Sequence, residues 1–140
     1  MVTFEISISD ILSLLAFGFS IYVFFKNKID TSYIATIDIE QNIFKIKCSL
    51  TETEANYKVF SSDPKDPLYE TYKSSYNEQI IALISAFETY CEMYYKNQIV
   101  KSLFKRKYKY EIKNLFKNEL YSKFITNEHK YLTKFYNSLK

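Results

Sequence analysis

The pattern of hydrophobic and polar positions divides the chain into an apolar opening and a longer amphipathic remainder. Residues 11–25 form an apolar run, ILSLLAFGFSIYVFF, without a charged side chain, and all 19 Lys and Arg residues follow it. An uncharged apolar helix suits the hydrocarbon core of a bilayer, and lysines hold a helix end at the cytoplasmic interface. The pattern therefore predicts a transmembrane helix with its flanks over residues 1–28 and a cytoplasmic body over residues 29–140.

The predicted span is short, because a helix rises about 1.5 Å per residue and crosses the hydrocarbon in roughly 20 residues. We expect Phe4, Ile6 and Ile8 to lengthen the apolar stretch, and Lys26 and Lys28 to reach outward to the headgroups. A secretory signal peptide is one alternative, although it has a basic start and a small-residue cleavage site that this sequence lacks. A buried core helix is the other, and it predicts a polar stripe.

Small residues recur along one side of the predicted span at intervals of four, three and four: Ser9, Ser13, Ala16 and Ser20. Small side chains let a second helix approach closely, so these residues are candidates for helix association in the membrane. The alternative is that they are ordinary members of the span, since small residues are common in transmembrane helices.

The remainder is predicted to be all-α. The chain has 1 Gly and 2 Pro among 140 residues, too few of the turn formers that a many-stranded sheet requires. A core helix is marked by apolar residues that share one face: Ile80, Ile84, Phe87, Cys91 and Tyr94. A loop is expected near residues 61–67, where the sequence reads SSDPKDP. The predicted fold is one N-terminal transmembrane helix followed by a small three- or four-helix cytoplasmic bundle.

Later boundaries follow from the same periodicity. A polar break is expected at residues 96–98, followed by a second amphipathic helix over residues 100–116. Asn127 and Glu128 are expected to cap a last helix that runs through Leu132, Phe135 and Leu139.

Residues 30–50 fit two structures. Ile34, Ile37, Gln41, Phe44 and Cys48 keep helical spacing, whereas the segment 44–50 alternates strictly between apolar and polar residues, as a strand does. Continuity with the preceding apolar helix and the absence of glycine favour a helix, and the β-branched content favours a hairpin.

Charge divides the body in two. Residues 30–92 hold eleven acidic and five basic residues, while residues 96–140 hold twelve basic and three acidic residues. Basic side chains near the membrane meet anionic lipid headgroups. The candidate interface residues are Lys26, Lys28, Lys105, Arg106, Lys107 and Lys109. Pairing between the two halves is the alternative, and nucleic acid is not expected, since arginine is its preferred reader and Arg106 is the single arginine.

The sequence carries no enzyme signature. His129 lies between Glu128 and Lys130 in the last predicted helix, where a structural role is expected. Cys48 and Cys91 are expected to stay reduced in a cytoplasmic body, with Cys91 in the core. Glu88, Cys91 and Glu92 lack a second ligand cluster with metal-site spacing, so neither a metal nor a cofactor is expected.

A pattern over residues 76–108, which continues to Ile112, resembles a known class of proteins. Its residues are Ile84, Phe87, Glu88, Tyr90, Cys91, Tyr94, Tyr95, Gln98, Ile99, Phe104, Tyr108, Glu111 and Ile112. This pattern, an apolar helix with an embedded Glu and Cys, a turn and a basic helix, resembles uncharacterised bacterial single-pass membrane proteins with a short helical cytoplasmic domain. The resemblance implies a bacterial inner-membrane protein, in some cases from a defence-associated locus, and it implies no active site.

Two functions are consistent with these features. The first is a non-enzymatic membrane effector or signalling component that self-associates, in bacterial anti-phage defence or toxicity. The second is a membrane anchor or scaffold that recruits a cytoplasmic protein. The expected partners are the lipid bilayer and either a second copy or another protein, with the N-terminus outside and the body in the cytoplasm.

Overall fold

The computed structural model describes residues 8–61 and 65–140, and it describes side chains from residue 12 onward within these ranges. The described residues form helices and no strand, which confirms the all-α expectation. The helices are α1 (Ile8–Phe60), α2 (Pro67–Tyr95), α3 (Lys101–Lys117), α4 (Glu119–Ser122) and α5 (Lys130–Asn137). Residues 30–50 therefore belong to a helix, and α1 runs without interruption through the expected boundary at residue 28.

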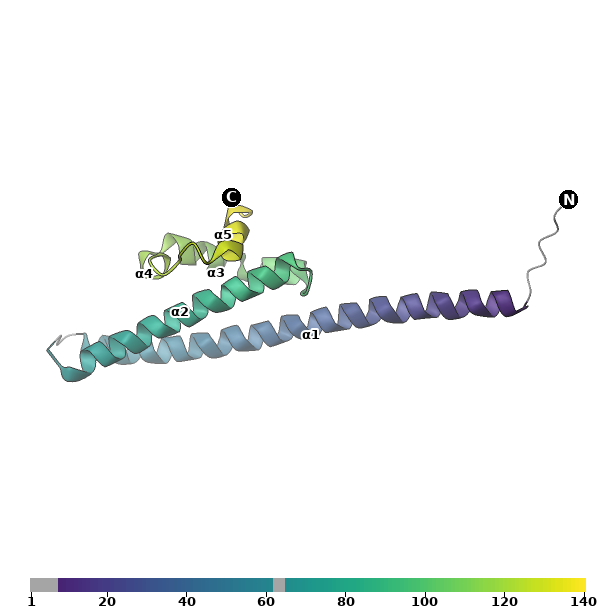
Figure 1. Ribbon diagram of the computed structural model, residues 1–140. Coiled ribbons are helices and arrows are strands. Elements are labelled where there is room, and N and C mark those ends of the chain that lie inside the picture. Colours follow the sequence, from purple (N-terminus) through teal and green to yellow (C-terminus); the bar gives the residue numbers. More distant parts are fainter. Residues whose placement is uncertain (1–7, 62–64) are drawn as a thin grey trace.

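The second half of α1 packs antiparallel against α2, while its N-terminal half extends away from all the other helices (Figure 1). Ile39, Ile43 and Leu50 of α1 are buried, as are Ile80 and Ile84 of α2. The core is completed from the C-terminal helices by Phe104, Tyr108, Ile112, Leu115, Leu132 and Phe135. The body thus consists of a long α1–α2 hairpin with three shorter helices packed against it, where the sequence predicted a three- or four-helix bundle.

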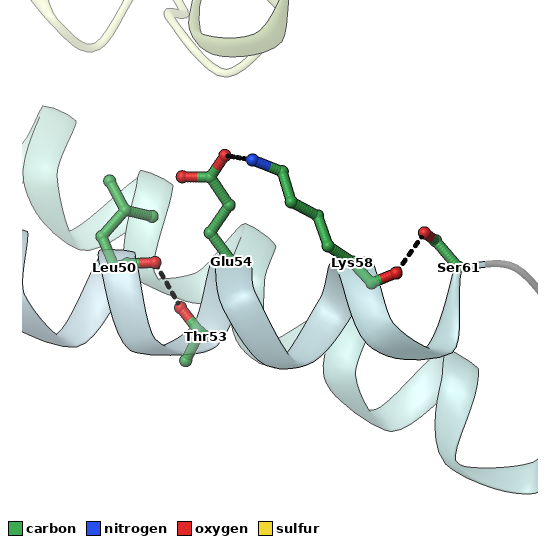
Figure 2. Close-up of polar contacts among 5 residues, drawn as sticks. All are labelled: Leu50, Thr53, Glu54, Lys58 and Ser61. Atoms are coloured by element: carbon green, nitrogen blue, oxygen red, sulfur yellow. Dashed lines mark hydrogen bonds and ion pairs between the residues drawn. The ribbon is translucent and has the colours of Figure 1, made fainter.

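The C-terminal end of α1 at Phe60 agrees with the loop expected near residues 61–67, of which 62–64 lie outside the described residues. Figure 2 shows its last turns, in which Lys58 Nζ lies 2.6 Å from Glu54 Oε1. The Ser61 hydroxyl donates a hydrogen bond to the Lys58 carbonyl at 2.8 Å, which satisfies one of the carbonyls exposed at the helix end (Figure 2). The positive charge of Lys58 also complements the negative end of the helix dipole.

Local chemistry explains both ends of α2. Asp66 Oδ1 accepts a hydrogen bond from the Leu68 N–H at 2.8 Å, and Pro67 occupies the first turn, where a missing N–H costs nothing. At the other end Asn97 adopts φ 56°, a left-handed conformation that Asn tolerates better than most residues. The Gln98 N–H then donates to the Met93 carbonyl at 3.0 Å. The break expected at residues 96–98 is confirmed.

The turn between α2 and α3 is tied to α1. The N–H of Val100, the residue before α3, donates to Thr36 Oγ1 at 3.1 Å, and the Thr36 hydroxyl donates to the Ser32 carbonyl at 2.7 Å. Thr36 is buried, so this bond satisfies polar groups that have lost contact with water. It fixes where α3 starts relative to α1.

The start of the last helix differs from the expectation. Helix α5 begins at Lys130 rather than after Asn127, and Leu139 lies beyond its end. Its first turn is capped from another helix: the carboxylate of Glu88, on α2, accepts hydrogen bonds from the backbone N–H groups of Tyr131 and Leu132 at 3.1 and 2.8 Å. A cap from a distant part of the sequence leaves no local signal, which explains the misplaced boundary.

Candidate membrane-spanning segment

The N-terminal half of α1 exposes a large apolar surface. Leu14 and Phe19 are 68% and 67% exposed. The other large apolar side chains exposed between residues 12 and 25 are Leu12, Leu15, Phe17, Ile21, Tyr22, Phe24 and Phe25. Soluble monomers rarely show contiguous apolar patches of this extent. The segment is therefore not a buried core helix of this domain.

Length and composition together make this helix able to cross a membrane. Among the described residues, α1 is the one helix long and apolar enough for this, and none of its apolar window is buried. Residues 8–25 are helical and span about 27 Å at 1.5 Å per residue, close to the thickness of the hydrocarbon core. Phe4 and Ile6, which were expected to lengthen the span, lie outside the described residues.

A stretch of exposed helix separates the apolar segment from the body. Lys26 and Lys28 are exposed directly after Phe25, and Thr36 is the first buried residue of α1 among those described. Neither lysine forms an ion pair within the described ranges. Both charges therefore lie at the end of the apolar segment without an acidic partner among the described residues.

The small residues of the segment lie on one exposed side of α1. Ser13, Ala16 and Ser20 are all exposed, and the Ser20 hydroxyl donates to the Ala16 carbonyl at 2.9 Å. A serine that satisfies its hydroxyl within the helix can face lipid or a second helix without an unpaired donor. Ser9 belongs to α1, but its side chain lies outside the described residues.

The structure places Lys107 of α3 away from Lys26 and Lys28 of α1. Lys107 Nζ lies 2.7 Å from Glu40 Oε2, so it is level with Glu40 on α1. Glu40 lies twelve residues after Lys28, which is about 18 Å farther from the apolar segment. Lys109 Nζ stands 4.7 Å from the ring centre of Tyr110.

Within this group of α3, Lys105 and Arg106 are exposed to solvent and Lys107 is held by Glu40. The second ion pair between α1 and α3 joins Lys47 and Glu111, whose charged atoms lie 2.6 Å apart. Pairing between the two halves of the body therefore occurs. Lys26 and Lys28 remain the basic residues next to the apolar segment.

A groove that the sequence patterns did not indicate lies at the base of the projecting helix. It has a volume of about 600 Å³ and is formed between α1 and the α2–α3 turn. Its α1 wall includes Phe24, Lys28 and Ser32, and the turn contributes Asn97 and Gln98. Two expectations from the sequence fall near this groove, the break at residues 96–98 and the interface candidate Lys28, but neither indicated a groove.

The residues considered for catalysis have structural roles. Cys91 is fully buried, and burial, together with the nearby charge of Glu88, raises the pKa of its thiol, so the sulfur is neutral. Glu88 caps α5, and the Thr126 N–H donates to Nδ1 of His129 at 3.0 Å. Among the described residues, no three His, Cys, Asp or Glu side chains gather in a way that could hold a metal ion.

Comparison with known proteins gives no assignment, since no family model, curated protein or solved structure matches the chain.

Proposed function

We propose that this protein is a single-pass membrane protein of the bacterial inner membrane, in which residues 8–25 of α1 cross the bilayer. The proposal depends on one observation: an apolar helix projects from a folded body without being covered by it. Nine large apolar side chains are exposed between residues 12 and 25. Moving them from water into hydrocarbon gains on the order of 15 kcal/mol, at roughly 1.5–3 kcal/mol for each side chain.

Charge gives the orientation of the proposed span. Lys26 and Lys28 follow the apolar segment directly, and all other basic residues come later in the chain. Positive residues next to a transmembrane helix remain on the cytoplasmic side. The body is therefore proposed to lie in the cytoplasm and the N-terminus outside.

We further propose that the protein acts without catalysis, as a self-associating effector or signalling component in anti-phage defence or toxicity. The structural support is that the largest group of exposed apolar side chains lies on the N-terminal half of α1. Glu88 and Cys91, by contrast, serve the fold: Glu88 caps α5 and Cys91 is buried. In such a protein, association of the bodies would change the packing of the spans, and this would perturb the bilayer.

Induced expression in a bacterial host, with a membrane-potential dye as the readout, tests the effector role. We expect the potential and the growth rate to fall with the wild-type protein. They should stay normal with a Leu15→Lys, Phe19→Lys variant, because charges in mid-span oppose insertion. Tyr110→Lys is the matched control, since Tyr110 is exposed on the body, and it should behave as wild type. Unchanged potential and growth with the wild-type protein would refute the effector role.

A further inference from the structure

The body half of α1 has two apolar faces, and α2 covers one of them. Ile39 and Ile43 are buried against the rest of the body, whereas Ile37 and Phe44 are 52% and 67% exposed. Ile37 precedes Ile39 by two residues, which corresponds to a rotation of about 200° around a helix. The exposed face therefore points away from α2 and has no partner in the described part of the chain.

The exposed face follows the spacing of a coiled coil. Its residues recur at intervals of three and four, and we name them the outer seam: Ile34, Ile37, Gln41, Phe44, Cys48 and Thr51. In a heptad these are alternating a and d positions, with Ile34, Gln41 and Cys48 at a. Within the outer seam Gln41 is the polar residue at an a position, and a polar side chain at an a position, such as Asn or Lys, helps to fix the register of such pairs.

The same register continues into the apolar segment. Toward the N-terminus, alternating intervals of four and three residues from Ile34 give Asp30 and Asn27. The same intervals then give four uncharged residues: Val23, Ser20, Ala16 and Ser13. The candidate helix-association residues of the span and the outer seam thus lie along one heptad line of the same continuous helix. A straight α-helix drifts by about 20° per heptad from this line, so a left-handed supercoil is needed for full contact.

The surface around Cys48 is shaped to receive a side chain. A shallow hollow of about 570 Å³ is bordered by Phe44, Lys47, Cys48, Thr51 and Glu52. These are a, d, e and g positions, the set that surrounds an inserted knob in coiled-coil packing.

Charges beside the outer seam match those of a second, parallel copy. The g positions Glu40 and Lys47 would face the e positions Lys45 and Glu52 of the other copy, five residues later in each case. Both pairs join opposite charges. Glu40 and Lys47 already form ion pairs with α3, but their side chains are still 37% and 42% exposed, so a further partner can reach them.

From this geometry we propose that two copies of the chain pair along the outer seam as a parallel, in-register coiled coil of α1. The partner is a second copy because the flanking charges complement those of an identical helix in parallel orientation. The proposal deepens the proposed function and rests on it for the parallel direction, because two copies inserted in the same sense run parallel. Asp30 is the one charged residue on the heptad line between Ser13 and Thr51, and it opposes pairing at that point.

Oxidative cross-linking of the full chain in membranes tests this pairing directly. In a parallel, in-register pair the two Cys48 side chains face each other, at a separation that a disulfide can bridge. Treatment with copper phenanthroline, which accepts the two electrons as the two thiols lose their protons, should convert most of the protein into a covalent dimer. Cys91→Ser should cross-link equally well, and Cys48→Ser should not.

Variants separate this pairing from chance collisions. In a Cys48→Ser background, Ile37→Cys lies in the outer seam and should restore the covalent dimer. Ala82→Cys is also at an exposed position, on α2, and should give at least tenfold less. Phe44→Lys should also reduce the Cys48 dimer at least tenfold, and Tyr110→Lys should leave it unchanged. Because Phe44 and Tyr110 are both exposed, circular dichroism should show unaltered helix content in both variants.

Asp30→Asn provides a gain-of-pairing variant. Removing the one charge from the heptad line should raise the yield of Cys48 dimer severalfold at low protein density. Equal cross-linking at Cys48 and Ala82→Cys, no cross-linking at Cys48, or cross-linking of Cys48 to a different protein would each overturn the proposed pairing. If the full chain instead appears in the soluble fraction, the membrane proposal fails, and Cys48 cross-linking in that fraction still decides the pairing.

Discussion

The carboxylate of Glu88 on α2 accepts a hydrogen bond of 2.8 Å from the backbone N–H of Leu132, the third residue of α5. The N–H of Tyr131 donates to the other oxygen of the same carboxylate at 3.1 Å. One side chain thereby satisfies two of the four unpaired donors at the start of α5, and its negative charge complements the helix dipole. The last helix is held on the core by a residue that lies more than forty positions earlier in the chain.

Replacing this cap should loosen the C-terminal helix. We expect Glu88→Ala to lower the free energy of unfolding by about 1–2 kcal/mol, because it leaves two helix donors without a protein acceptor. Glu92→Ala is the matched control: Glu92 pairs with Lys96 on the surface, and its loss should cost less than about 0.5 kcal/mol. Urea unfolding in a mild detergent measures both. Equal costs for the two variants would contradict the capping role of Glu88.

Buried tyrosines predict a loss of stability in alkali. Burial raises the pKa of Tyr76 from its ordinary value of 10.0 to about 12, so the folded protein keeps a phenolic proton that the unfolded chain releases. The stability due to this group is complete below pH 10 and decreases as the pH rises toward 12.

Unfolding measured between pH 9 and pH 11 should therefore show a decline that is smaller in Tyr76→Phe. Tyr110→Phe removes an exposed hydroxyl and serves as the control, with the slope of the wild type. An identical pH slope in Tyr76→Phe and the wild type would show that Tyr76 does not keep its proton in the folded state.

The two thiols should differ sharply in reactivity. Burial raises the pKa of Cys91, which suppresses the reactive thiolate, whereas Cys48 is exposed. Brief treatment of the folded protein with iodoacetamide, in detergent dilute enough to keep the chain monomeric, should add one group, at Cys48, and unfolding in urea should allow a second. Mass spectrometry of tryptic peptides locates the groups. Labelling of Cys91 in the native protein would mean that α2 does not pack as described.

Some parts of the fold follow from the sequence by local rules. The periodic apolar residues of α2, the loop after Phe60 and the break before Ile99 are all found where they were expected. In each case the signal is local in the sequence: apolar residues spaced along one helix, a polar loop that contains proline, or a polar turn that contains Asn97.

The segment 44–50 shows why the alternating pattern was ambiguous. Leu50 is buried and Ile46 packs against the core, whereas Phe44 and Cys48 belong to the outer seam on the opposite side. A helix with two opposite apolar faces places apolar residues two positions apart, as a half-buried strand does. Periodicity alone does not distinguish these cases, because it is tertiary packing that covers one of the two faces.

The positions of the candidate membrane-interface residues on α3 could not be predicted from local sequence patterns, because they depend on contacts between distant segments. Lys107 was expected near the membrane, and its ion pair with Glu40 joins residues far apart in the sequence. The contact depends on how α3 is placed by the bond between Val100 and Thr36. That Lys26 and Lys28 contact lipid, and that Ser13, Ala16 and Ser20 support association, remain predictions.

Extraction of membranes with alkaline carbonate tests the central claim, that residues 8–25 of α1 span a bilayer. After expression of the full chain and lysis without detergent, we expect the wild-type protein in the carbonate-resistant pellet and in the soluble fraction only after detergent is added. The Tyr110→Lys protein should remain with the pellet, and the Leu15→Lys, Phe19→Lys protein should leave it. Recovery of the wild-type protein in the carbonate supernatant, still folded, would contradict the account.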